Sequence, residues 1–338
     1  MSLVVADGLG NERKENVNII DIGRAESSRL KRMIKTSRKA VETAASLNAD
    51  LYHFHDPDLL VSALGLRKKG CVVFDSHEDF PALMLQRDYI PDFARNLLFR
   101  LARFIESYSA KRLSGIVCAT ETIRKKFEAY GTLRTETVRN YPVFADDENR
   151  PKHCRPEKAV ACYVGGLTEV RGVKEMVLSC YKAGVKLLLA GEFDSADYFE
   201  QVKAMPQWEN VEFIGYVPNA EVKEKVYDRS ALGLVLLHKA PNHTHSIPIK
   251  QLEYMQAGLP VVASREVLFC KQVTQTENCG LVVNPLDTDE VAEAIGAIIN
   301  NPERAKQMSE NAFRASADKY NWSSQEKLLL NFYSSLLK

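Results

Sequence analysis

Short apolar runs rich in β-branched residues alternate with stretches of helical hydrophobic spacing along all 338 residues of the chain. This alternation is typical of βα units that build parallel sheets. In the first part of the chain it predicts strands near 2–6, 17–22, 50–54, 71–75, 115–119 and 136–139. It predicts helices there near 27–46, 57–68, 91–112 and 120–130.

A second series follows an irregular charged stretch, 146–152, which has the composition of an interdomain linker. Its strands are predicted near 159–164, 185–190, 211–214, 232–237, 260–263 and 280–283. Its helices are predicted near 172–183, 219–229, 248–257, 287–300, 302–319 and 323–337. The pattern therefore predicts an α/β chain of two Rossmann-like domains, 1–145 and 146–322. We also expect the last helix, 323–338, to pack back on the first domain.

Composition narrows the class of protein. Lys and Arg total 45 against 44 Asp and Glu, so the net charge of +1 gives no electrostatic footprint for nucleic acid. No apolar run approaches the roughly 20 residues needed to span a bilayer, and the N-terminus lacks a signal-peptide pattern. The seven cysteines form no C-x-x-C pair and are interpreted as buried reduced thiols. These features favour a cytoplasmic protein.

The opening of the chain contains half of a dinucleotide-binding fingerprint, Gly8-x-Gly10. In a phosphate-binding loop of this type a helix follows the glycines. Here the pattern predicts another strand instead, so we interpret these glycines as a turn between two strands.

The stretch 238–263 carries the most specific chemistry in the sequence. Ser246 is expected to cap a helix that has Pro248 at an early position. Lys250 and Glu253 are three residues apart and therefore share one face of that helix. A helix N-terminus beside a lysine suits a diphosphate, and a carboxylate one turn later can accept hydrogen bonds from ribose hydroxyls. An exposed Lys–Glu ion pair on a surface helix would have the same spacing.

The same stretch reads Ser246-x-Pro248-x-Lys250-x-x-Glu253-Tyr254-Met255-x-Ala257-Gly258-Leu259-Pro260-Val261-Val262-Ala263. It closely resembles the donor-site motif of the family 4 glycosyltransferases, which have the GT-B fold. Further segments in the right order also resemble the family: 163–173, 189–191, 213–217, 53–58 and 75–78. The resemblance covers about 50–337 and implies two Rossmann-like domains that face each other across a cleft.

The resemblance assigns roles to individual residues. Glu253 would hold the nucleotide ribose, and Arg171, assisted by Lys250, would neutralise the diphosphate. His55 matches a histidine that faces the donor sugar across the cleft. The remaining assigned residues are, for donor binding, Gly165, Gly166, Ser246, Ile247, Pro248 and Ile249, and, in the cleft, His77 and Glu78.

Two positions depart from the family pattern. His245 stands where the first glutamate of the family's E-x7-E motif would fall, and Gly166 replaces a common arginine. Contacts to the sugar and part of the diphosphate clamp must therefore differ or be weaker. We expect His245 to act in the sugar pocket, together with His238 and His243 on the same loop.

No metal is expected at the site. No carboxylate or thiol accompanies the three loop histidines at a usual zinc spacing. Asp56-x-Asp58 is interpreted as helix capping. The resemblance implies retaining, metal-independent sugar transfer, in which the cations and a helix N-terminus stabilise the departing phosphate. It implies a UDP- or GDP-linked sugar and a glycan or lipid-linked acceptor in surface polysaccharide biosynthesis, with no cofactor.

The family's first strand, loop and helix, a unit of about 30 residues, precede anything seen in this chain. We expect a lost start rather than a rearranged domain. A central position of the first sheet is then open, and the first domain should be less stable than the second and prone to associate.

Two segments combine basic and apolar residues. Segment 24–39 holds seven basic residues and one acidic residue, and 91–112 carries Arg95, Arg100 and Arg103. Each is either a core-facing helix with a solvated basic side or a surface for anionic lipid. The second interpretation suits an enzyme that is peripheral on the inner face of a membrane.

Two other functions remain open from the sequence. A catalytically inactive nucleotide-sugar-binding or scaffold protein is favoured by His245, Gly166 and the missing opening. A nucleotide-sugar epimerase of the same architecture is disfavoured because its acid and base carboxylates have no obvious counterpart. Turnover of the donor distinguishes the transferase from the inactive protein, and a change in sugar stereochemistry identifies the epimerase.

Overall fold

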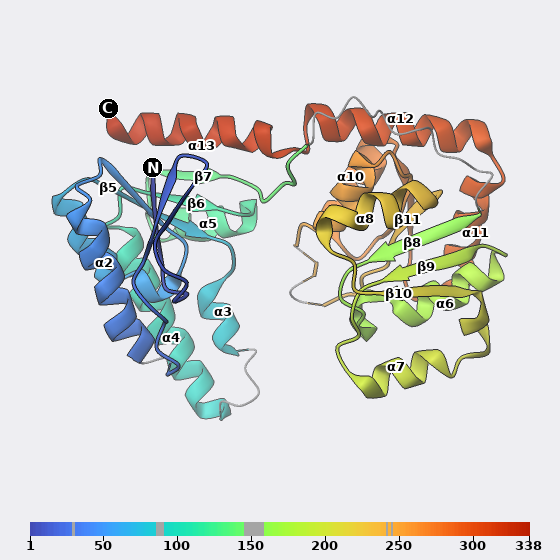
Figure 1. Ribbon diagram of the computed structural model, residues 1–338, viewed down its shortest axis with the longest axis horizontal. Helices are drawn as coiled ribbons and strands as arrows, with labels where there is room; N and C mark the ends of the chain where they lie inside the picture. Colours follow the sequence, from blue (N-terminus) through green and yellow to red (C-terminus); the bar gives the residue numbers. More distant parts are fainter. Residues whose placement is uncertain (29–30, 86–90, 145–158, 241–242, 245) are drawn as a thin grey trace. The chain divides into compact units, whose positions relative to one another are not determined.

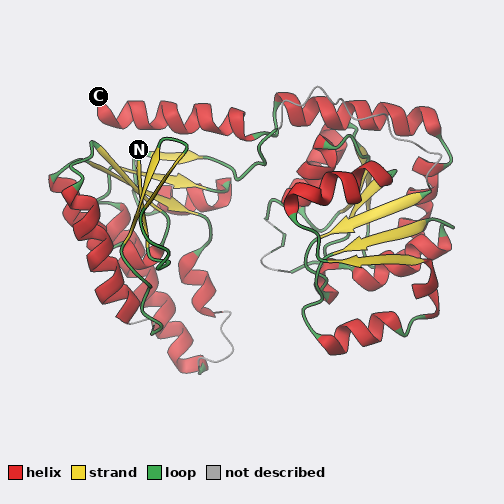
Figure 2. Cartoon of the chain, viewed as in Figure 1, coloured by secondary structure: helices red, strands yellow, loops and turns green. Residues whose placement is uncertain are grey.

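The computed structural model describes all residues except 29–30, 86–90, 145–158, 241–242 and 245 (Figure 1). The chain divides into two compact units: unit 1 is 1–139 with 326–338, and unit 2 is 140–325. The sequence pattern places these divisions at 145/146 and 322/323. Each unit contains helices packed on parallel strands, which confirms the predicted α/β class (Figure 2).

Unit 2 is built on a six-stranded sheet in the order β10-β9-β8-β11-β12-β13, with every pair parallel. The strands are β8 Val160–Val164, β9 Lys186–Ala190, β10 Val211–Gly215, β11 Leu232–Val235, β12 Val261–Ser264 and β13 Gly280–Val283. The helices are α6 Val173–Lys182, α7 Ala196–Lys203, α8 Asn219–Lys225, α9 Ile249–Gln256, α10 Leu268–Glu277, α11 Thr288–Ile299 and α12 Pro302–Asp318.

Both faces of this sheet are covered by helices. Side chains alternate along each strand, so Leu187 and Leu189 enter the core under α6 and α11, whereas Leu188 and Ala190 enter the core under α9 and α10. All four are fully buried. Burial on both faces explains the near-continuous apolar runs by which these strands are recognised in the sequence.

The strand order reverses between β8 and β11, which are neighbours in the sheet. The chain leaves β8 toward one edge of the sheet and β11 toward the other. The loops that follow these two strands therefore begin side by side at the carboxyl edge, where ligands bind in open α/β sheets. This arrangement brings the loop after β8 next to the segment that leads into α9.

Unit 1 contains two separate sheets rather than one. A four-stranded parallel sheet has the order β4-β5-β6-β7, and a three-stranded sheet has the order β1-β3-β2. The strands are β1 Ser2–Val5, β2 Glu12–Lys14, β3 Val17–Asp21, β4 Leu51–Phe54, β5 Cys71–Ser76, β6 Gly115–Cys118 and β7 Thr135–Thr137. The α-helices are α2 Ser37–Ser46, α3 Phe80–Leu85, α4 Asp92–Ala110, α5 Glu121–Ala129 and α13 Trp322–Leu337, the last of which begins in unit 2.

The two faces of the four-stranded sheet pack against different elements. One face buries Tyr52, Phe54 and Phe74 in an apolar core. On the other face, Phe332 and Leu336 of α13 lie so close to Gly115 that a side chain there would collide with the Phe332 ring. The C-terminal helix therefore packs on unit 1.

The opening turn is not a phosphate loop. The Asp21 carboxylate accepts hydrogen bonds from the backbone N–H groups of Gly8, Gly10 and Gly23 at 3.2, 2.9 and 2.8 Å. The amides that would cradle a phosphate are thus already occupied, and β2 and β3 follow instead of a helix. This confirms the interpretation of Gly8-x-Gly10 as a turn between strands.

Several element predictions need correction. The segment 57–68 forms two 3-10 helices, Pro57–Leu59 and Ser62–Lys68. The segment predicted as one helix at 27–46 has a π-helical turn at Arg32–Thr36 before α2. The sequence pattern did not predict β2, α3, α7 or α10. Within the residues that the structure describes, every helix is too short or too polar to cross a membrane.

We expect unit 1 to open more readily than unit 2. No strand within the described ranges pairs with the second edge of β1 or of β4, so backbone amides on those edges lack a ladder partner. Hydrogen–deuterium exchange should therefore be faster for β1 and β4 than for β8 and β11. Equal protection of the two sets of strands would contradict this expectation.

Candidate donor-binding site

The loop after β8 holds Arg171 against two glycines. The Arg171 guanidinium donates a hydrogen bond to the Tyr163 hydroxyl at 3.3 Å, and that hydroxyl donates to the Gly166 carbonyl at 3.2 Å. A side chain at Gly165 would begin 3.3 Å from Arg171 Nη1, so the guanidinium lies directly over this loop. The structure thus brings three predicted site residues, Gly165, Gly166 and Arg171, together.

Gly172 explains how the chain turns after Arg171. It has a φ of 77°, in the left-handed region, and a side chain there would collide with the Leu236 carbonyl after β11. The residue ends the 3-10 turn Glu169–Arg171 and precedes α6. Glycine at this position therefore allows the loop after β8 to lie against the chain that leaves β11.

Helix α9 begins one residue later than predicted. Pro248 is the N-cap, with φ −69° and ψ 107°, and no side chain caps the helix. The prediction that Ser246 is the cap is wrong, because its hydroxyl donates instead to the His243 carbonyl at 2.9 Å within the preceding loop. The two neighbouring predicted residues have different surroundings: Ile247 packs against the apolar core and Ile249 is the first helical residue.

Glu253 is the centre of a polar group on α9. Its Oε2 accepts hydrogen bonds from the Lys250 ammonium at 2.6 Å and from the Tyr227 hydroxyl at 2.8 Å. Burial, together with the adjacent carboxylate, raises the pKa of Tyr227 far above its ordinary value, so its hydroxyl stays a donor. Among the described residues Oε1 has no hydrogen-bond partner, so one carboxylate oxygen is available to a ligand.

The Lys250–Glu253 ion pair that the spacing allows is therefore formed, but it is not a solvated surface pair. The two side chains are only 28% and 20% exposed. Glu253 and Ile249 also line a cavity of about 520 Å³ between α8 and α9. Its other lining residues include Asn219, Lys223 and Tyr227.

Tyr254 is a positioning residue that the sequence reasoning missed. It is fully buried, and its hydroxyl oxygen accepts a hydrogen bond from the backbone N–H of Val164 at 3.2 Å. Its ring packs on Gly233, where any side chain would overlap it, and meets the Tyr227 ring edge-on with centroids 5.6 Å apart. Glycine in the middle of a buried strand was the available signal, because it marks a close approach.

The histidine-rich loop lies partly outside the described residues, and His245 is among those outside. The backbone N–H of His238 donates to the Val170 carbonyl at 2.9 Å. The His238 imidazole lies 3.3 Å from the Glu175 carboxylate of α6, so a carboxylate accompanies this histidine in space although none does in the sequence. His243 Nδ1 lies 3.3 Å from the His238 carbonyl oxygen.

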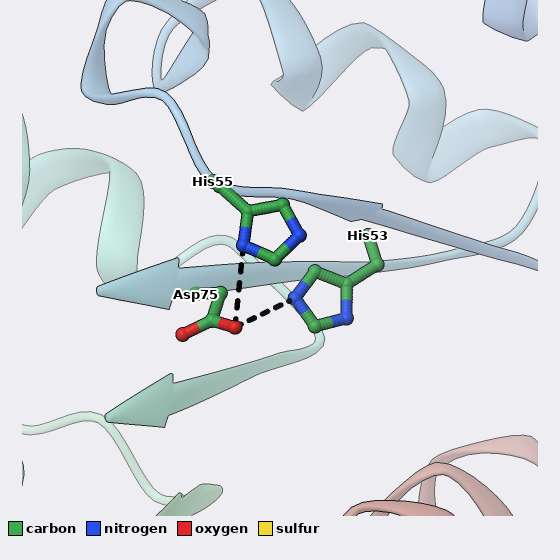
Figure 3. A group of neighbouring side chains, drawn as sticks. All are labelled: His53, His55 and Asp75. Carbon is green, nitrogen blue, oxygen red and sulfur yellow. Dashed lines mark ion pairs between the residues drawn. The ribbon is translucent and has the colours of Figure 1, made fainter. Parts of the chain in front are cut away.

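In unit 1, the predicted residue His55 belongs to a cluster at the carboxyl ends of β4 and β5 (Figure 3). His53 Nε2 and His55 Nδ1 each lie 3.3 Å from Asp75 Oδ2. His77 Nε2 lies 3.7 Å from Asp75 Oδ1 and 3.0 Å from His55 Nδ1. Glu78, which was also predicted at the site, is exposed and lies two residues after the end of β5.

Burial and the imidazoles act on Asp75 in opposite directions. Burial alone would raise the pKa of its carboxyl. The contacts with His53 and His55 and the charge of His77 outweigh it and hold the pKa well below its usual range. Asp75 is therefore an ionised carboxylate. Asp56 accepts a hydrogen bond from the Asp58 backbone N–H at 2.8 Å, which confirms that it is a helix cap.

We expect Tyr254→Phe to lower the free energy of unfolding of unit 2 by about 1–3 kcal/mol, because the buried Val164 N–H loses its acceptor. Nucleotide affinity should fall as well, since the hydrogen bond between α9 and the end of β8 is lost. Chemical denaturation and calorimetry measure the two effects. Tyr181→Phe, at a half-exposed tyrosine of α6, is the matched control and should change stability by less than about 0.5 kcal/mol. Equal stabilities for the two variants would show that the bond is unimportant.

Two known proteins illustrate the sequence similarity of this chain to glycosyltransferases. The alpha-D-kanosaminyltransferase of Streptomyces kanamyceticus is 23% identical over 255 residues, which are 70% of this chain and 64% of that protein. An uncharacterized glycosyltransferase of Methanocaldococcus jannaschii is 28% identical over 182 residues, 52% of this chain and 45% of that protein. The chain thus spans less than two thirds of the length of these relatives.

Solved structures show the same fold at low sequence identity. Sucrose-phosphate synthase from Thermosynechococcus elongatus superposes with a TM-score of 0.73 at 16% identity, covering 99% of this chain and 88% of that one. Anabaena HepE in complex with UDP superposes with a TM-score of 0.71 at 15% identity, covering 94% of this chain and 86% of that one. These likenesses confirm the predicted GT-B fold class.

Family comparison agrees with the division of the chain. The model of Glycosyltransferase Family 4 matches residues 2–141, most of unit 1. The model of Glycosyl transferases group 1 matches residues 145–315, about half of the chain and most of unit 2. The chain therefore belongs to the group 1, or family 4, glycosyltransferases.

Proposed function

We propose that this chain is a retaining glycosyltransferase that moves a sugar from a nucleotide-diphosphate sugar to a glycan or lipid-linked acceptor. The observation that carries the proposal is the grouping of Arg171, the Gly165–Gly166 loop and the Glu253 carboxylate around the switch point of the unit 2 sheet. Family membership supports it, as do the structures of HepE, a fold relative, with UDP and with UDP-glucose.

Arg171 suits the diphosphate because its charge is uncompensated. Its side chain donates a hydrogen bond to a neutral hydroxyl, that of Tyr163, and no carboxylate in the described part of the chain forms an ion pair with it. It is partly buried, where a guanidinium binds phosphate more strongly than it does in bulk water. As the bond to the sugar breaks, negative charge grows on the leaving phosphate, and a fixed cation there lowers the barrier.

Glu253 suits the ribose for a complementary reason. Its Oε1 is available to hydroxyl donors, whereas Lys250 and Tyr227 hold Oε2 and fix the orientation of the carboxylate. A preoriented acceptor loses little conformational entropy when the ligand binds. The cavity beside Glu253 provides room for further parts of the ligand.

For a lipid-linked acceptor, we propose that helix α4 contacts an anionic membrane. On α4, Ala102 and Glu106 face inward, and Glu106 binds Lys126 of α5 at 2.9 Å. The opposite face carries an apolar stripe that includes Leu97, Leu101 and Phe104, which are 67%, 50% and 66% exposed. The exposed Arg100 and Arg103 lie on the same helix. Apolar side chains beside arginines are typical of helices that bind lipid headgroups at the interface.

Segment 24–39 contributes less to this surface than its composition indicates. Arg32 pairs with Asp58 at 3.0 Å and Arg38 with Glu42 at 2.7 Å. Lys39 donates to the Ile22 carbonyl at 2.6 Å. We therefore assign the membrane contact to α4.

A thermal-shift screen with UDP, GDP, ADP and their common sugars identifies the donor. With that donor, the chain should release the nucleoside diphosphate, and NMR of the product should show the anomeric configuration of the donor. Binding without turnover would favour the inactive binding protein, and inversion at C1 would exclude a retaining mechanism.

Arg171→Ala and Glu253→Ala should each weaken nucleotide binding about ten- to a hundredfold, because a hydrogen bond to a charged group contributes roughly 1.5–3 kcal/mol. Glu221→Ala is the matched control, since it also breaks a Lys–Glu pair on a unit 2 helix, with Lys225. Calorimetry with the donor identified above measures all three. An unchanged affinity in either site variant removes that residue from the site.

Vesicle sedimentation tests the membrane contact. The chain should bind anionic vesicles, and binding should fall with salt because surface charges are screened beyond about 10 Å at 0.1 M. Leu97→Glu with Phe104→Glu should abolish binding and leave nucleotide affinity unchanged. Leu133→Glu, at an exposed leucine outside α4, is the control and should bind as the unmodified chain does. Equal binding to neutral vesicles would contradict the proposal.

A further inference from the structure

We propose that His53, His55 and Asp75, with His77 as a fourth ligand, bind one divalent transition-metal ion of the zinc class. This goes beyond the sugar-transfer function and does not depend on it. It also departs from the expectation, drawn from sequence spacing, that the protein holds no metal. The inference rests on the positions of ligand atoms in unit 1.

The ligand atoms of His53, His55 and Asp75 are spaced as the ligands of a zinc ion are. Ligands about 2.0–2.2 Å from a tetrahedral zinc ion lie about 3.3–3.6 Å from one another. His53 Nε2 and His55 Nδ1 each lie 3.3 Å from Asp75 Oδ2, and the ligand atoms of these three residues all lie within 4.8 Å of one another. His77 Nε2 lies 3.0 Å from His55 Nδ1 and 3.7 Å from Asp75 Oδ1. The ligand atoms of His53, His55 and Asp75 thus have the spacing of ligands that share one ion, and His77 lies beside two of them.

The cluster also contains buried polar atoms without a hydrogen-bond partner. His53 Nε2 and Asp75 Oδ1 are buried and have no hydrogen-bond partner, although His53 Nε2 is within ion-pair distance of the carboxylate. Buried polar atoms without partners are uncommon in native proteins, and a bound ion is one explanation for them. A cation bound by His53 Nε2 and by both oxygens of the Asp75 carboxylate would satisfy both atoms.

A hydrogen bond on the far side of the ring orients His53. Its Nδ1 is hydrogen-bonded to the Tyr333 hydroxyl of α13. When Nδ1 carries the proton in that bond, the lone pair of Nε2 is directed at Asp75. A hydrogen bond from the second ring nitrogen is the usual device that orients a metal-binding histidine. In that tautomer His53 presents the lone pair of Nε2 to a metal ion, and Tyr333 holds the ring in place.

Coordination requires a modest rotation of the rings. The His53 and His55 rings are stacked with centroids 4.7 Å apart and an interplanar angle of 21°, and His55 stacks on His77 at 5.3 Å and 16°. A bound ion lies in the plane of each ring, so His55 and His77 must turn toward it. Their side chains are 61% and 49% exposed, which leaves room for this motion.

The donor atoms decide the class of ion. Imidazole nitrogens with one carboxylate select zinc and its transition-metal neighbours, whereas magnesium and calcium prefer oxygen ligands. Two adjacent strands position the ligands. His53 lies on β4 and His55 directly follows its last residue, whereas Asp75 lies on β5, one residue after the last pair of the ladder between the two strands. An ion here would lock His55 and His77 in fixed orientations at the carboxyl edge of the sheet.

Titration of the EDTA-stripped full chain with Zn²⁺ alone tests the proposal. We expect one ion per chain by calorimetry, and an increase in the melting temperature of the protein with zinc concentration. Co²⁺ should give the d–d absorption of a site made of nitrogen and oxygen ligands, without the charge-transfer band of a thiolate. This spectrum separates the site from binding by any of the seven cysteines.

Asp75→Asn and His55→Gln should each weaken zinc binding at least tenfold and remove the cobalt spectrum. His55 is exposed, so its variant keeps the test valid if Asp75→Asn does not fold. His238→Gln is the matched control, because that histidine also faces a carboxylate but belongs to unit 2, and it should bind zinc as the unmodified chain does.

Absence of stoichiometric zinc binding would overturn the proposal. So would affinity that is unchanged in His55→Gln, or loss of binding in His238→Gln alone. Nucleotide binding by unit 2 is measured on the same samples, so a failure of the metal site and a failure of the proposed sugar transfer give different results.

Discussion

The complete burial of Tyr254 is the constraint on which the site in unit 2 depends. Its hydroxyl oxygen must find a donor inside the protein, and the backbone N–H of Val164 at the end of β8 supplies it. Its ring needs a strand without a side chain, which Gly233 of β11 provides. These two requirements fix α9 over the junction of β8 and β11. Glu253, one residue earlier on α9, is consequently held where the sheet order reverses.

The parallel sheets of the two units are buried in different ways. In unit 2, helices cover both faces, and the strand ends can carry loops that are free to bind a ligand. In unit 1, the strands fall into two sheets, and α13 returns from the end of the chain to cover one face of the larger sheet. That return places Tyr333 behind His53. The polar cluster of unit 1 therefore depends on the packing of a helix that is distant in sequence.

The sequence predicts what local patterns encode and misses what the tertiary structure creates. The buried strands were predicted because an apolar run between turn residues indicates a strand whichever elements pack against it. Helices α7 and α10 were missed, as was the short strand β2, whose charged residues carry no apolar alternation. The cap at Ser246 was predicted from residue type, but the hydroxyl found a nearer acceptor in its own loop. Asp75 and His53 are 22 positions apart, and only the register of β4 with β5 brings them together.

The charges of unit 2 indicate which part of the proposed donor, the ribose or the diphosphate, each residue would contact. Lys250 already neutralises Glu253, so a diphosphate that recruits Lys250 must compete with a carboxylate at 2.6 Å. Among the described residues, the hydrogen-bond partner that Arg171 would release is the neutral Tyr163 hydroxyl. A ribose that binds Oε1 leaves the bond between Oε2 and Lys250 intact, and the mostly buried carboxylate stays compensated. In the proposed site, Glu253 would then hold the ribose and Arg171 would neutralise the phosphate charge. In the sequence, a Lys250–Glu253 ion pair is an alternative to a binding site. In this arrangement the ion pair would form part of the binding site.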